Sequence, residues 1–177
     1  MNLKIRDIQP SDSEKLIDYF LNASPTFLKN MGADQSKLPK REKWLKKLKH
    51  EAHKEDKQKK SFYVIWLLDD EPIGHSNIND IEFGVSGEMH LHMWKVDKRR
   101  SGLGFKFLQL SIREYFKRFK LKTIICEPNS ENKAPNKTLT KLGFKFIKRY
   151  ETKPSAIALF QTVNHYELDR NDFQGID

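Results

Sequence analysis

The sequence lacks any apolar stretch approaching the roughly 18 residues that a membrane-spanning helix requires. Residues 1–6 are not followed by a hydrophobic signal region, which argues against a secretory leader. Cysteine is almost absent, since Cys126 is the only one. A single cysteine excludes an internal disulfide and is typical of a reducing compartment. We therefore expect a cytoplasmic protein in which Cys126 is a small buried strand residue.

Internal repeats, low-complexity tracts and linkers rich in Pro, Gly or Ser are also missing. The length of 177 residues suits one domain with a core of useful size. Hydrophobic residues make up 37% and aromatic residues 11%, which is enough for a packed interior. We therefore expect a single domain over residues 1–177.

Negative charge is scarce in one region of a chain whose net charge is +9. Residues 37–60 hold eleven Lys and Arg against four acidic residues, a balance of +7, so the remainder carries only +2. Such a stretch suits nucleic acid, an acidic protein or cofactor phosphates, but it is also typical of a solvated helix face. It lacks interleaved exposed aromatics and any recognised reading motif, so nucleic-acid binding is kept only as the alternative function.

Hydrophobic periodicity predicts a mixed α/β arrangement. Strands are predicted near residues 3–8, 61–68, 73–78, 88–96, 123–126, 144–150 and 159–168. Helices are predicted after Ser11, after Ser36, over 105–119 and over 135–142. Ser11 and Glu14 have capping-box spacing, and Pro39 suits the first turn of the second helix. Residues 22–34 are expected to be irregular.

The segment Arg99-Arg100-Ser101-Gly102-Leu103-Gly104 lies between a predicted strand and a predicted helix. Glycine lets the backbone approach a ligand closely, and the free N–H groups of a helix's first turn attract an anion. Pyrophosphate is the natural occupant, although a glycine pair before a helix also serves packing. The P-loop spacing is absent, and Phe107 stands where the dinucleotide pattern needs its third glycine.

This loop resembles the acetyl-CoA loop R/Q-x-x-G-x-G/A of the GNAT acetyltransferase superfamily. A second segment, residues 132–144 (NKAPNKTLTKLGF), is similar to that superfamily's later N-x-x-A/S helix running into L-G-F. The two segments lie about 30 residues apart, as in the family, and the element order agrees over nearly the whole chain. The resemblance implies an α/β (α+β mixed) fold with a mostly antiparallel sheet of six to seven strands and about four helices.

The resemblance also implies which residues bind the co-substrate acetyl-CoA. Backbone amides of the loop would hold the pyrophosphate, the strand end would pair with the pantetheine, and the later helix would contact the CoA arm. The residues so implied are Trp94, Val96, Arg99, Arg100, Ser101, Gly102, Leu103, Gly104, Phe105, Asn132, Asn136 and Lys137. No metal is expected.

Two residues depart from the family pattern. Pro135 occupies the usual Ala/Ser position, and Leu139 stands where many N-terminal amine acetyltransferases have a tyrosine that protonates the leaving thiolate. Tyr150 and Tyr166 on the last strands are substitute acids without a specific signal, and solvent is a further proton source.

Base candidates lie on the strand before the loop. Glu88, His90, His92 and Trp94 alternate, so their side chains point to one face. By resemblance, Glu88 matches the catalytic glutamate of histone-type members, while histidine suits base work near neutral pH. The two histidines are equally explained as half-buried strand residues, and His-x-His also has metal-ligand spacing without a third strong ligand beyond Glu88.

Together these patterns predict an N-acetyltransferase that moves acetyl from acetyl-CoA to a primary amine by direct attack in a ternary complex. The acceptor is a small molecule or a peptide, and the basic stretch at 37–60 argues mildly against a polycationic one. We expect no membrane or nucleic-acid partner and a monomer or a homodimer. A CoA-binding regulatory domain without activity is the other alternative, because Leu139 replaces the usual acid.

Overall fold

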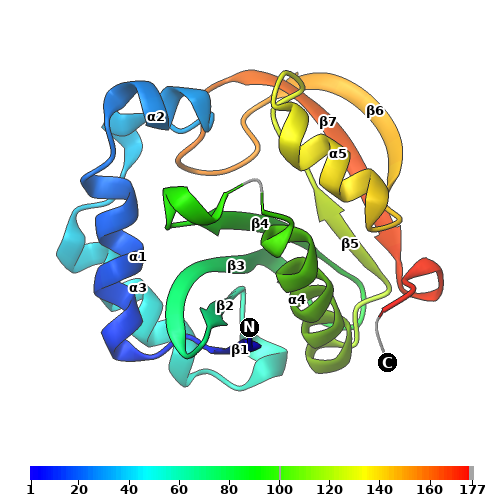
Figure 1. The fold of residues 1–177 in the computed structure, drawn as a ribbon, viewed down its shortest axis with the longest axis horizontal. Coiled ribbons are helices and arrows are strands. Elements are labelled where there is room, and N and C mark those ends of the chain that lie inside the picture. The colour runs from blue at the N-terminus through cyan, green and yellow to red at the C-terminus, as the bar shows by residue number, and fades with distance from the viewer. Residues whose placement is uncertain (100, 176–177) are drawn as a thin grey trace.

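A computed structural model describes residues 1–99 and 101–175 of the chain (Figure 1). Its strands and helices follow in the order β1 (Leu3–Asp7), α1 (Pro10–Leu21), α2 (Pro25–Asn30), α3 (Arg41–His53), β2 (Ser61–Leu68), β3 (Glu71–Glu82), β4 (Ser86–Met93), α4 (Leu103–Phe119), β5 (Thr123–Cys126), α5 (Lys133–Lys141), β6 (Lys145–Thr152) and β7 (Gln161–Asp169). The predicted α/β fold is confirmed, with one helix more than expected.

The strands form one seven-stranded sheet in the order β1-β2-β3-β4-β5-β7-β6. Neighbours are antiparallel throughout, except that β4 and β5 run parallel. A parallel pair requires a crossover connection, which α4 supplies between β4 and β5. The sequence therefore folds into a mixed sheet whose only parallel junction, among the described strands, lies next to the glycine loop.

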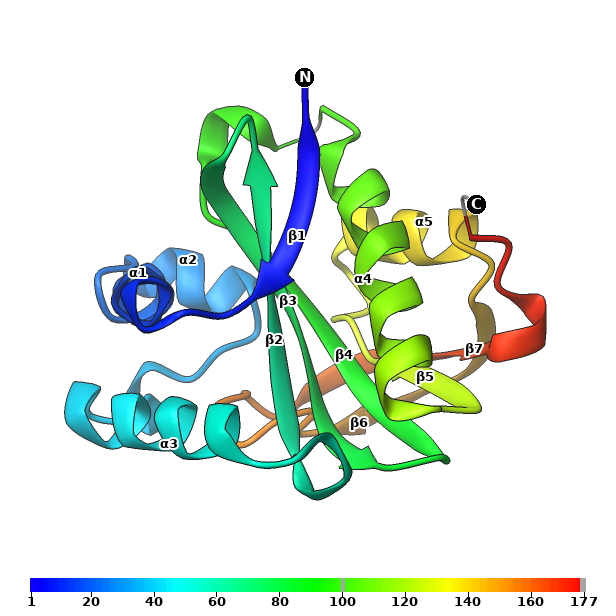
Figure 2. The same ribbon diagram turned by 90° about the horizontal axis from the view of Figure 1, so that it is seen from below.

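Helices cover both faces of the sheet, as Figure 2 shows, with α1, α2 and α3 on one side and α4 and α5 on the other. The larger hydrophobic core lies under α4 and α5 and includes the fully buried Trp66, Met89 and Phe107. The smaller core lies under α1, α2 and α3 and includes Leu16 and Trp44. Strand β4 therefore presents alternate side chains to two different environments.

Helix α4 forms as its apolar spacing predicts. The predicted stripe is buried at its central positions, with Leu108, Ile112 and Phe119 inaccessible to solvent. The helix begins at Leu103, directly after Gly102, whose φ of 80° is in the left-handed region that favours glycine. This start leaves the first N–H groups of α4 at the glycine loop.

The starts predicted for α1 and α3 were wrong. Helix α1 is capped by Gln9 and starts at Pro10, since proline suits the first helical position and Asp12, not Glu14, completes the capping box. Helix α3 starts at Arg41, because Ser36 is used in a separate turn in which it donates to Asp34.

Two further boundaries differ from prediction. Residues 25–30 form helix α2, capped by Ser24, where we expected irregular structure. Strand β4 ends at Met93 and Val96 lies in a short 3₁₀ turn, so the apolar pattern continues past the strand. Short elements of this kind depend on tertiary packing, which local periodicity does not record.

The basic stretch is largely a solvated helix surface. In α3, Trp44 and Leu48 are buried against α1, while the lysines at 43, 46, 47 and 49 are exposed. Its buried Glu51 accepts hydrogen bonds from the N–H groups of Lys60 and Ser61 and pairs with Lys54. Within the described part of the chain, no helix is both long and apolar enough to cross a membrane.

Asp12→Ala should reduce the free energy of unfolding by about 2–3 kcal/mol. The Asp12 side chain is 2% exposed, receives two bonds of 2.5 and 3.0 Å from Arg6, and accepts the Gln9 N–H. Urea denaturation measures the change. Glu14→Ala is the control, because Glu14 pairs with Arg41 at the surface and its loss should cost less than about 1 kcal/mol.

Candidate active site

The site begins where β4 and β5 part. Only Ser86, Gly87 and Glu88 pair with β5, opposite Thr123, Ile124 and Ile125, although β4 continues to Met93. Beyond Glu88 the edge of β4 that faces β5 has no strand partner in the described residues. Unpaired strand edges accept extended ligands through backbone hydrogen bonds.

The backbone groups at this edge belong to odd-numbered residues. The Trp94 N–H donates to the Ile73 carbonyl of β3, and Met93 is in register with Gly74. In an antiparallel ladder the neighbouring residues then point their backbone groups the other way. Leu91 and Met93 therefore face the parting. The resemblance had implied that Trp94 and Val96 pair with the pantetheine, whereas the N–H of Trp94 donates to β3.

The four alternating β4 side chains share the face that looks toward α1 and α2. Met89, between Glu88 and His90, is buried in the core under α4, and Trp94 packs with the core under α1. His92 contacts the rings of Tyr19 and Phe20 on α1, with ring centroids 5.6 and 5.0 Å away.

Glu88 and His90 form a half-buried polar pair at the parting of β4 and β5, with side chains that are 18% and 24% exposed. Their nearest atoms, Oε1 and Nε2, are 3.5 Å apart, and neither atom has a hydrogen-bond partner in the described residues. Burial, followed by the charges of Glu127 and Asp80, raises the pKa of Glu88 to about 8. Burial lowers the pKa of His90 to about 4. Glu88 is thus the group whose proton affinity suits base work near pH 8.

His92 is held in an aromatic stack. It lies 4.9 Å from the ring of His75, whose Nδ1 accepts a 2.8 Å hydrogen bond from Trp94 Nε1. Burial, then the neighbouring charges of His90 and Arg99, lowers the pKa of His92 to about 3. The stack fixes the orientation of the His92 ring, and the lowered pKa makes His92 a weak base.

Arg99 turns toward the open edge of β4. Its Nε and Nη2 donate to the Met93 carbonyl at 3.2 and 3.0 Å, and its guanidinium lies 4.9 Å from the centre of the Phe27 ring on α2. The resemblance placed this charge at the cofactor phosphates, whereas here it joins the strand edge to α2. Arg100 lies outside the described residues.

The rest of the glycine loop is open. Ser101 and Gly102 are exposed, and a Cβ placed on Gly102 or Gly104 would meet no atom within 4 Å. No side chain caps α4, while Leu103 is buried and anchors the helix start. Phe105 packs against the core. The first N–H groups of a 17-residue helix are therefore left for an anionic ligand.

The start of α5 is fixed by a second amide network. Asn136 Nδ2 donates to the carbonyls of Asn129 and Asn132, and Asn136 Oδ1 accepts from Asn164 of β7. Asn136 therefore shapes the turn before α5. Asn132 and Lys137 are exposed, and Lys137 has no ion pair among the described residues.

A polar cluster, of which the sequence analysis named only Tyr150, lies across β5, β6 and β7. Glu127 Oε1 accepts a 2.5 Å hydrogen bond from Tyr150 Oη and lies 2.5 Å from Nδ1 of His165. His165 Nε2 lies 2.9 Å from Glu167 Oε1. Sequence alternation places Glu127 on the face of Ile125, but the order of the last strands was needed to bring in His165.

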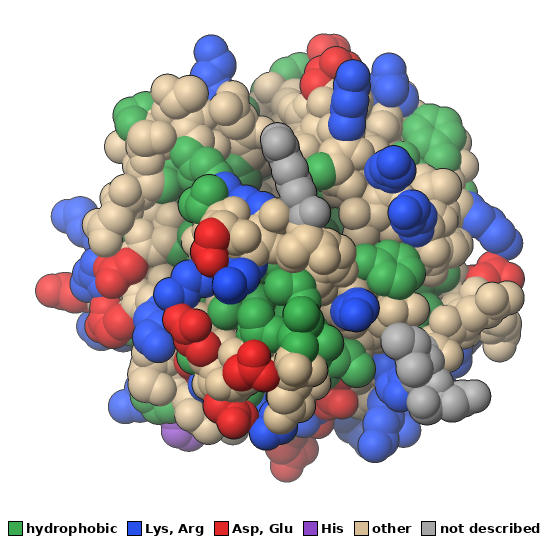
Figure 3. All heavy atoms as spheres, viewed as in Figure 1, with side chains coloured by type: hydrophobic (Ala, Val, Ile, Leu, Met, Phe, Trp, Pro, Cys, Tyr) green, Lys and Arg blue, Asp and Glu red, His purple; other side chains and the backbone are tan. Residues whose placement is uncertain are grey.

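Cations gather on the α4 and α5 side of the molecule. Figure 3 shows Lys and Arg side chains over the region where α5 and β6 lie in Figure 1. On α5 the lysines at 133, 137 and 141 are all exposed, at a spacing that places them on one helix face. This surface flanks the start of α4 and favours a ligand with several negative charges.

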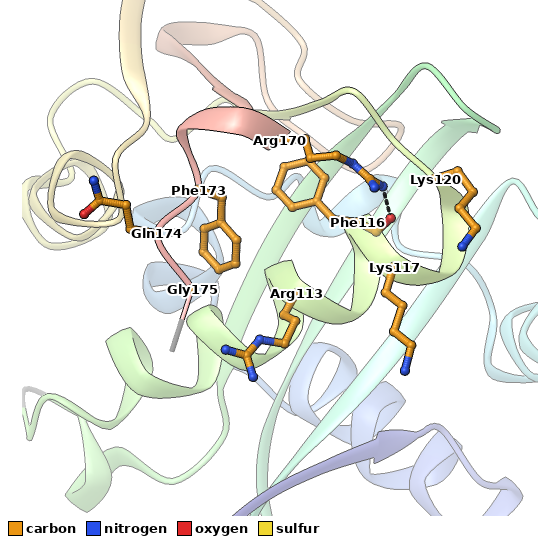
Figure 4. A pocket seen from close by; sticks show the side chains of 8 residues that line it. All are labelled: Arg113, Phe116, Lys117, Lys120, Arg170, Phe173, Gln174 and Gly175. Carbon is orange, nitrogen blue, oxygen red and sulfur yellow. Dashed lines mark hydrogen bonds between the residues drawn. The ribbon is translucent and has the colours of Figure 1, made fainter. Parts of the chain in front are cut away.

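A separate cavity of about 580 Å³ lies at the far end of α4, between that helix and residues 170–175 (Figure 4). It contains none of the β4 residues. Arg170 donates to the carbonyls of Phe116 and Leu121, so it closes the end of α4, where cations are favoured. Within residues 1–99 and 101–175, no three His, Cys, Asp or Glu side chains are placed to hold a metal ion.

We compared the sequence and the fold with those of known proteins. A family model described as an acetyltransferase (GNAT) domain matches residues 2–145. No curated protein sequence matches the chain significantly.

Solved structures share the fold at low identity. Spermidine N-acetyltransferase from Vibrio cholerae, in complex with CoA and spermine, has a TM-score of 0.78 and 12% identity, covering 96% of each chain. Ribosomal-protein-S5-alanine acetyltransferase from Vibrio fischeri has a TM-score of 0.73 and 19% identity, covering 98% of this chain and 96% of its own. An aminoglycoside acetyltransferase in complex with CoA has a TM-score of 0.71 and 15% identity, covering 98% of both chains.

Proposed function

This chain belongs to the GNAT acetyltransferase family, and from that membership we propose that it transfers acetyl from acetyl-CoA to a primary amine by direct attack within a ternary complex. One observation carries the proposal. The parallel pairing of β4 and β5 stops at Glu88, a half-buried residue whose Oε1 is shielded from solvent, and the chain then runs into the uncapped, glycine-led start of α4. A binding edge, a base and an anion site are thereby contiguous.

The residues fit acetyl-CoA as co-substrate. We propose that the N–H groups of Leu103, Gly104 and Phe105 hold its pyrophosphate, since the left-handed Gly102 leaves open space before them. The exposed lysines of α5, Lys137 among them, would attract its phosphates. The outward-facing backbone groups of Leu91 and the N–H of Met93, whose carbonyl already accepts from Arg99, would pair with its extended arm. When bound, acetyl-CoA supplies an acetyl group activated as a thioester.

We assign the amine proton to Glu88. A lysine-type amine has a pKa near 10 and must lose its proton to react. Glu88, with a pKa of about 8, is ionised at mildly alkaline pH and still binds a proton well. Its unpartnered Oε1 is free to accept a hydrogen bond from the amine. His90, whose pKa burial lowers to about 4, stays neutral beside it.

The acceptor wall is proposed to include α1, α2 and the β4 stack. Tyr19, Phe27 and His92 present aromatic surface there, and Arg99 adds a positive charge over Phe27. The structural neighbours act on a polyamine, a protein alanine and an aminoglycoside, so the shared fold leaves the acceptor open. We also propose that residues 1–177 act as one domain in the cytoplasm, which suits the buried, free Cys126.

Acetyl-CoA should stabilise the protein against heat. At one hundred times its dissociation constant a ligand adds about 2.7 kcal/mol, which corresponds to a rise in melting temperature of about 5–10 °C for a chain of this size. Differential scanning fluorimetry measures the shift, and an acceptor screen that follows thiol release then identifies the amine. A melting temperature unchanged at millimolar acetyl-CoA would contradict the proposal.

A further inference from the structure

We propose that Tyr150 is the acid that protonates the leaving thiolate, and that Glu127, His165 and Glu167 resupply its proton from solvent. The proposal rests on the proposed function and completes it, because Glu88 accounts only for the proton that leaves the amine.

The four side chains form a continuous chain of hydrogen bonds. Tyr150 Oη and His165 Nδ1 each lie 2.5 Å from the same oxygen, Glu127 Oε1, and His165 Nε2 lies 2.9 Å from Glu167 Oε1. These separations are short enough for proton transfer at every step. The four side chains come from β6, from β7 and from the residue after β5, so the arrangement is not a by-product of one local turn.

Exposure increases along the chain toward its outer end. The Glu127 side chain is 9% exposed, that of His165 is 14%, and that of Glu167 is 42%. The chain therefore connects a buried carboxylate to bulk water through one imidazole ring. A purely structural ion pair would not need the second carboxylate at the surface.

The inner end lies at the parting of β4 and β5. Glu88 pairs with Ile125, and Glu127 follows two residues later on the same face of β5. The charge of Glu127 contributes to the pKa of Glu88 and of His90, as expected for groups that face one another across the parting. Tyr150 thus reaches the reaction site from the side of β6, opposite α1.

The other two positions considered for the acid, Leu139 and Tyr166, lie in the core under α4 and α5. Leu139, where related enzymes have a tyrosine, is completely buried in the core under α4. Tyr166 points into that same core from β7. Tyr150 is half-buried on the other face, with Lys148 Nζ 4.6 Å from its ring centre.

The relay is needed because Tyr150 by itself holds its proton too tightly. The hydrogen bond to Glu127, then burial, raises the pKa of Tyr150 to about 12, whereas a thiol has a pKa of about 8.5. Burial opposes protonation of His165, but its bonds to Glu127 and Glu167 prevail and raise its pKa above the usual 6.5. Imidazolium is a far stronger acid than this phenol. When His165 reprotonates Tyr150, the overall transfer of a proton to the thiolate is therefore no longer unfavourable.

The protons balance as follows. As the carbon–nitrogen bond forms and the carbon–sulfur bond breaks, Glu88 takes the amine proton and Tyr150 gives its hydroxyl proton to sulfur. The Glu127 carboxylate passes the Nδ1 proton of His165 to the phenolate. The ring is then neutral, with its remaining proton on Nε2, so a half-turn of the imidazole brings the deprotonated Nδ1 to Glu167, through which water restores the second proton. No oxidant, metal or further reactant is required.

Tyr150→Phe should lower kcat about 100-fold while the KM for acetyl-CoA stays within about twofold. In the wild type, kcat should fall at high pH as His165 loses the proton that it delivers. In His165→Gln this fall should occur at a higher pH, since an amide cannot deliver a proton. Tyr166→Phe is the matched control, because it removes the same hydroxyl from the opposite face and should leave kcat and the profile unchanged.

NMR titration of the free protein gives a readout besides activity. The His165 ring should titrate above 6.5 in the wild type and lower in Glu127→Gln, while Tyr150→Phe should raise it further by freeing Glu127 Oε1. Wild-type kcat in Tyr150→Phe, from an enzyme that does acetylate amines, would overturn the relay alone. A wild-type protein that releases no thiol with any amine would overturn the proposed function and the relay with it.

Discussion

Gly102→Glu is expected to abolish the thermal stabilisation by acetyl-CoA, the largest binding effect expected of a single change in this chain. The residue caps α4 with a φ of 80° and faces open space. A glutamate there strains the backbone by about 1–2 kcal/mol. It also places a carboxylate at the helix start, where the phosphates would bind. Charge repulsion and the filled space act together against the ligand.

Gly84→Glu separates strain from binding. Gly84 has a φ of 79° and equally open surroundings, but it lies in the turn between β3 and β4. Both variants should melt at a lower temperature than the wild type without ligand. Only Gly102→Glu should lose the rise in melting temperature that acetyl-CoA causes. Differential scanning fluorimetry on both variants in parallel measures this. Equal rises in the two would show that the loop does not hold the cofactor.

Glu88→Gln should reduce kcat by about 10²–10⁴-fold, the range of a positioned general base. In the wild type, kcat should rise with pH through about 8, because Glu88 must be ionised to accept the amine proton. Burial and like charge disfavour that ionised form, which is why the rise comes near pH 8 and not near 4.5. Glutamine cannot ionise, so the variant should lose this limb. Rates measured from pH 6 to pH 10 at saturating substrate test both statements.

Asp80→Asn provides the matched variant for this profile. Asp80 is exposed, and its charge is one of those that raise the pKa of Glu88. Its φ of 48° is in the left-handed region, which asparagine tolerates well. The variant should keep its maximal rate while the rising limb moves to lower pH. If kcat of Glu88→Gln still rises with pH through about 8 as in the wild type, another group is the base.

Local pattern was sufficient where the chain makes its own structure. The stripe from Phe105 to Phe119 predicted α4, and the short run Thr-Ile-Ile-Cys predicted β5 with its bounds at Thr123 and Cys126. Alternation also predicted that Glu88 and His92 share a face. These features depend on periodicity alone, which sequence displays directly.

Local pattern failed where two signals competed for one boundary. Ser11 and Ser36 both look like helix caps, yet Gln9 with Pro10 begins α1 and Lys40 precedes α3. Helix α2 is only six residues long and is stabilised by packing against the smaller core, so its apolar spacing is too short to stand out. Helix ends are set by which cap the tertiary contacts favour.

The sequence by itself determined the family, the glycine loop and the face that bears Glu88, because these follow from residue order and period. Only the tertiary structure decided what those residues can do. Burial by strands and helices that are distant in sequence raises the pKa of Glu88 to about 8 and lowers the pKa of His92 to about 3. Glu127, Tyr150 and His165 meet because β7 lies between β5 and β6, an order that local sequence patterns do not encode.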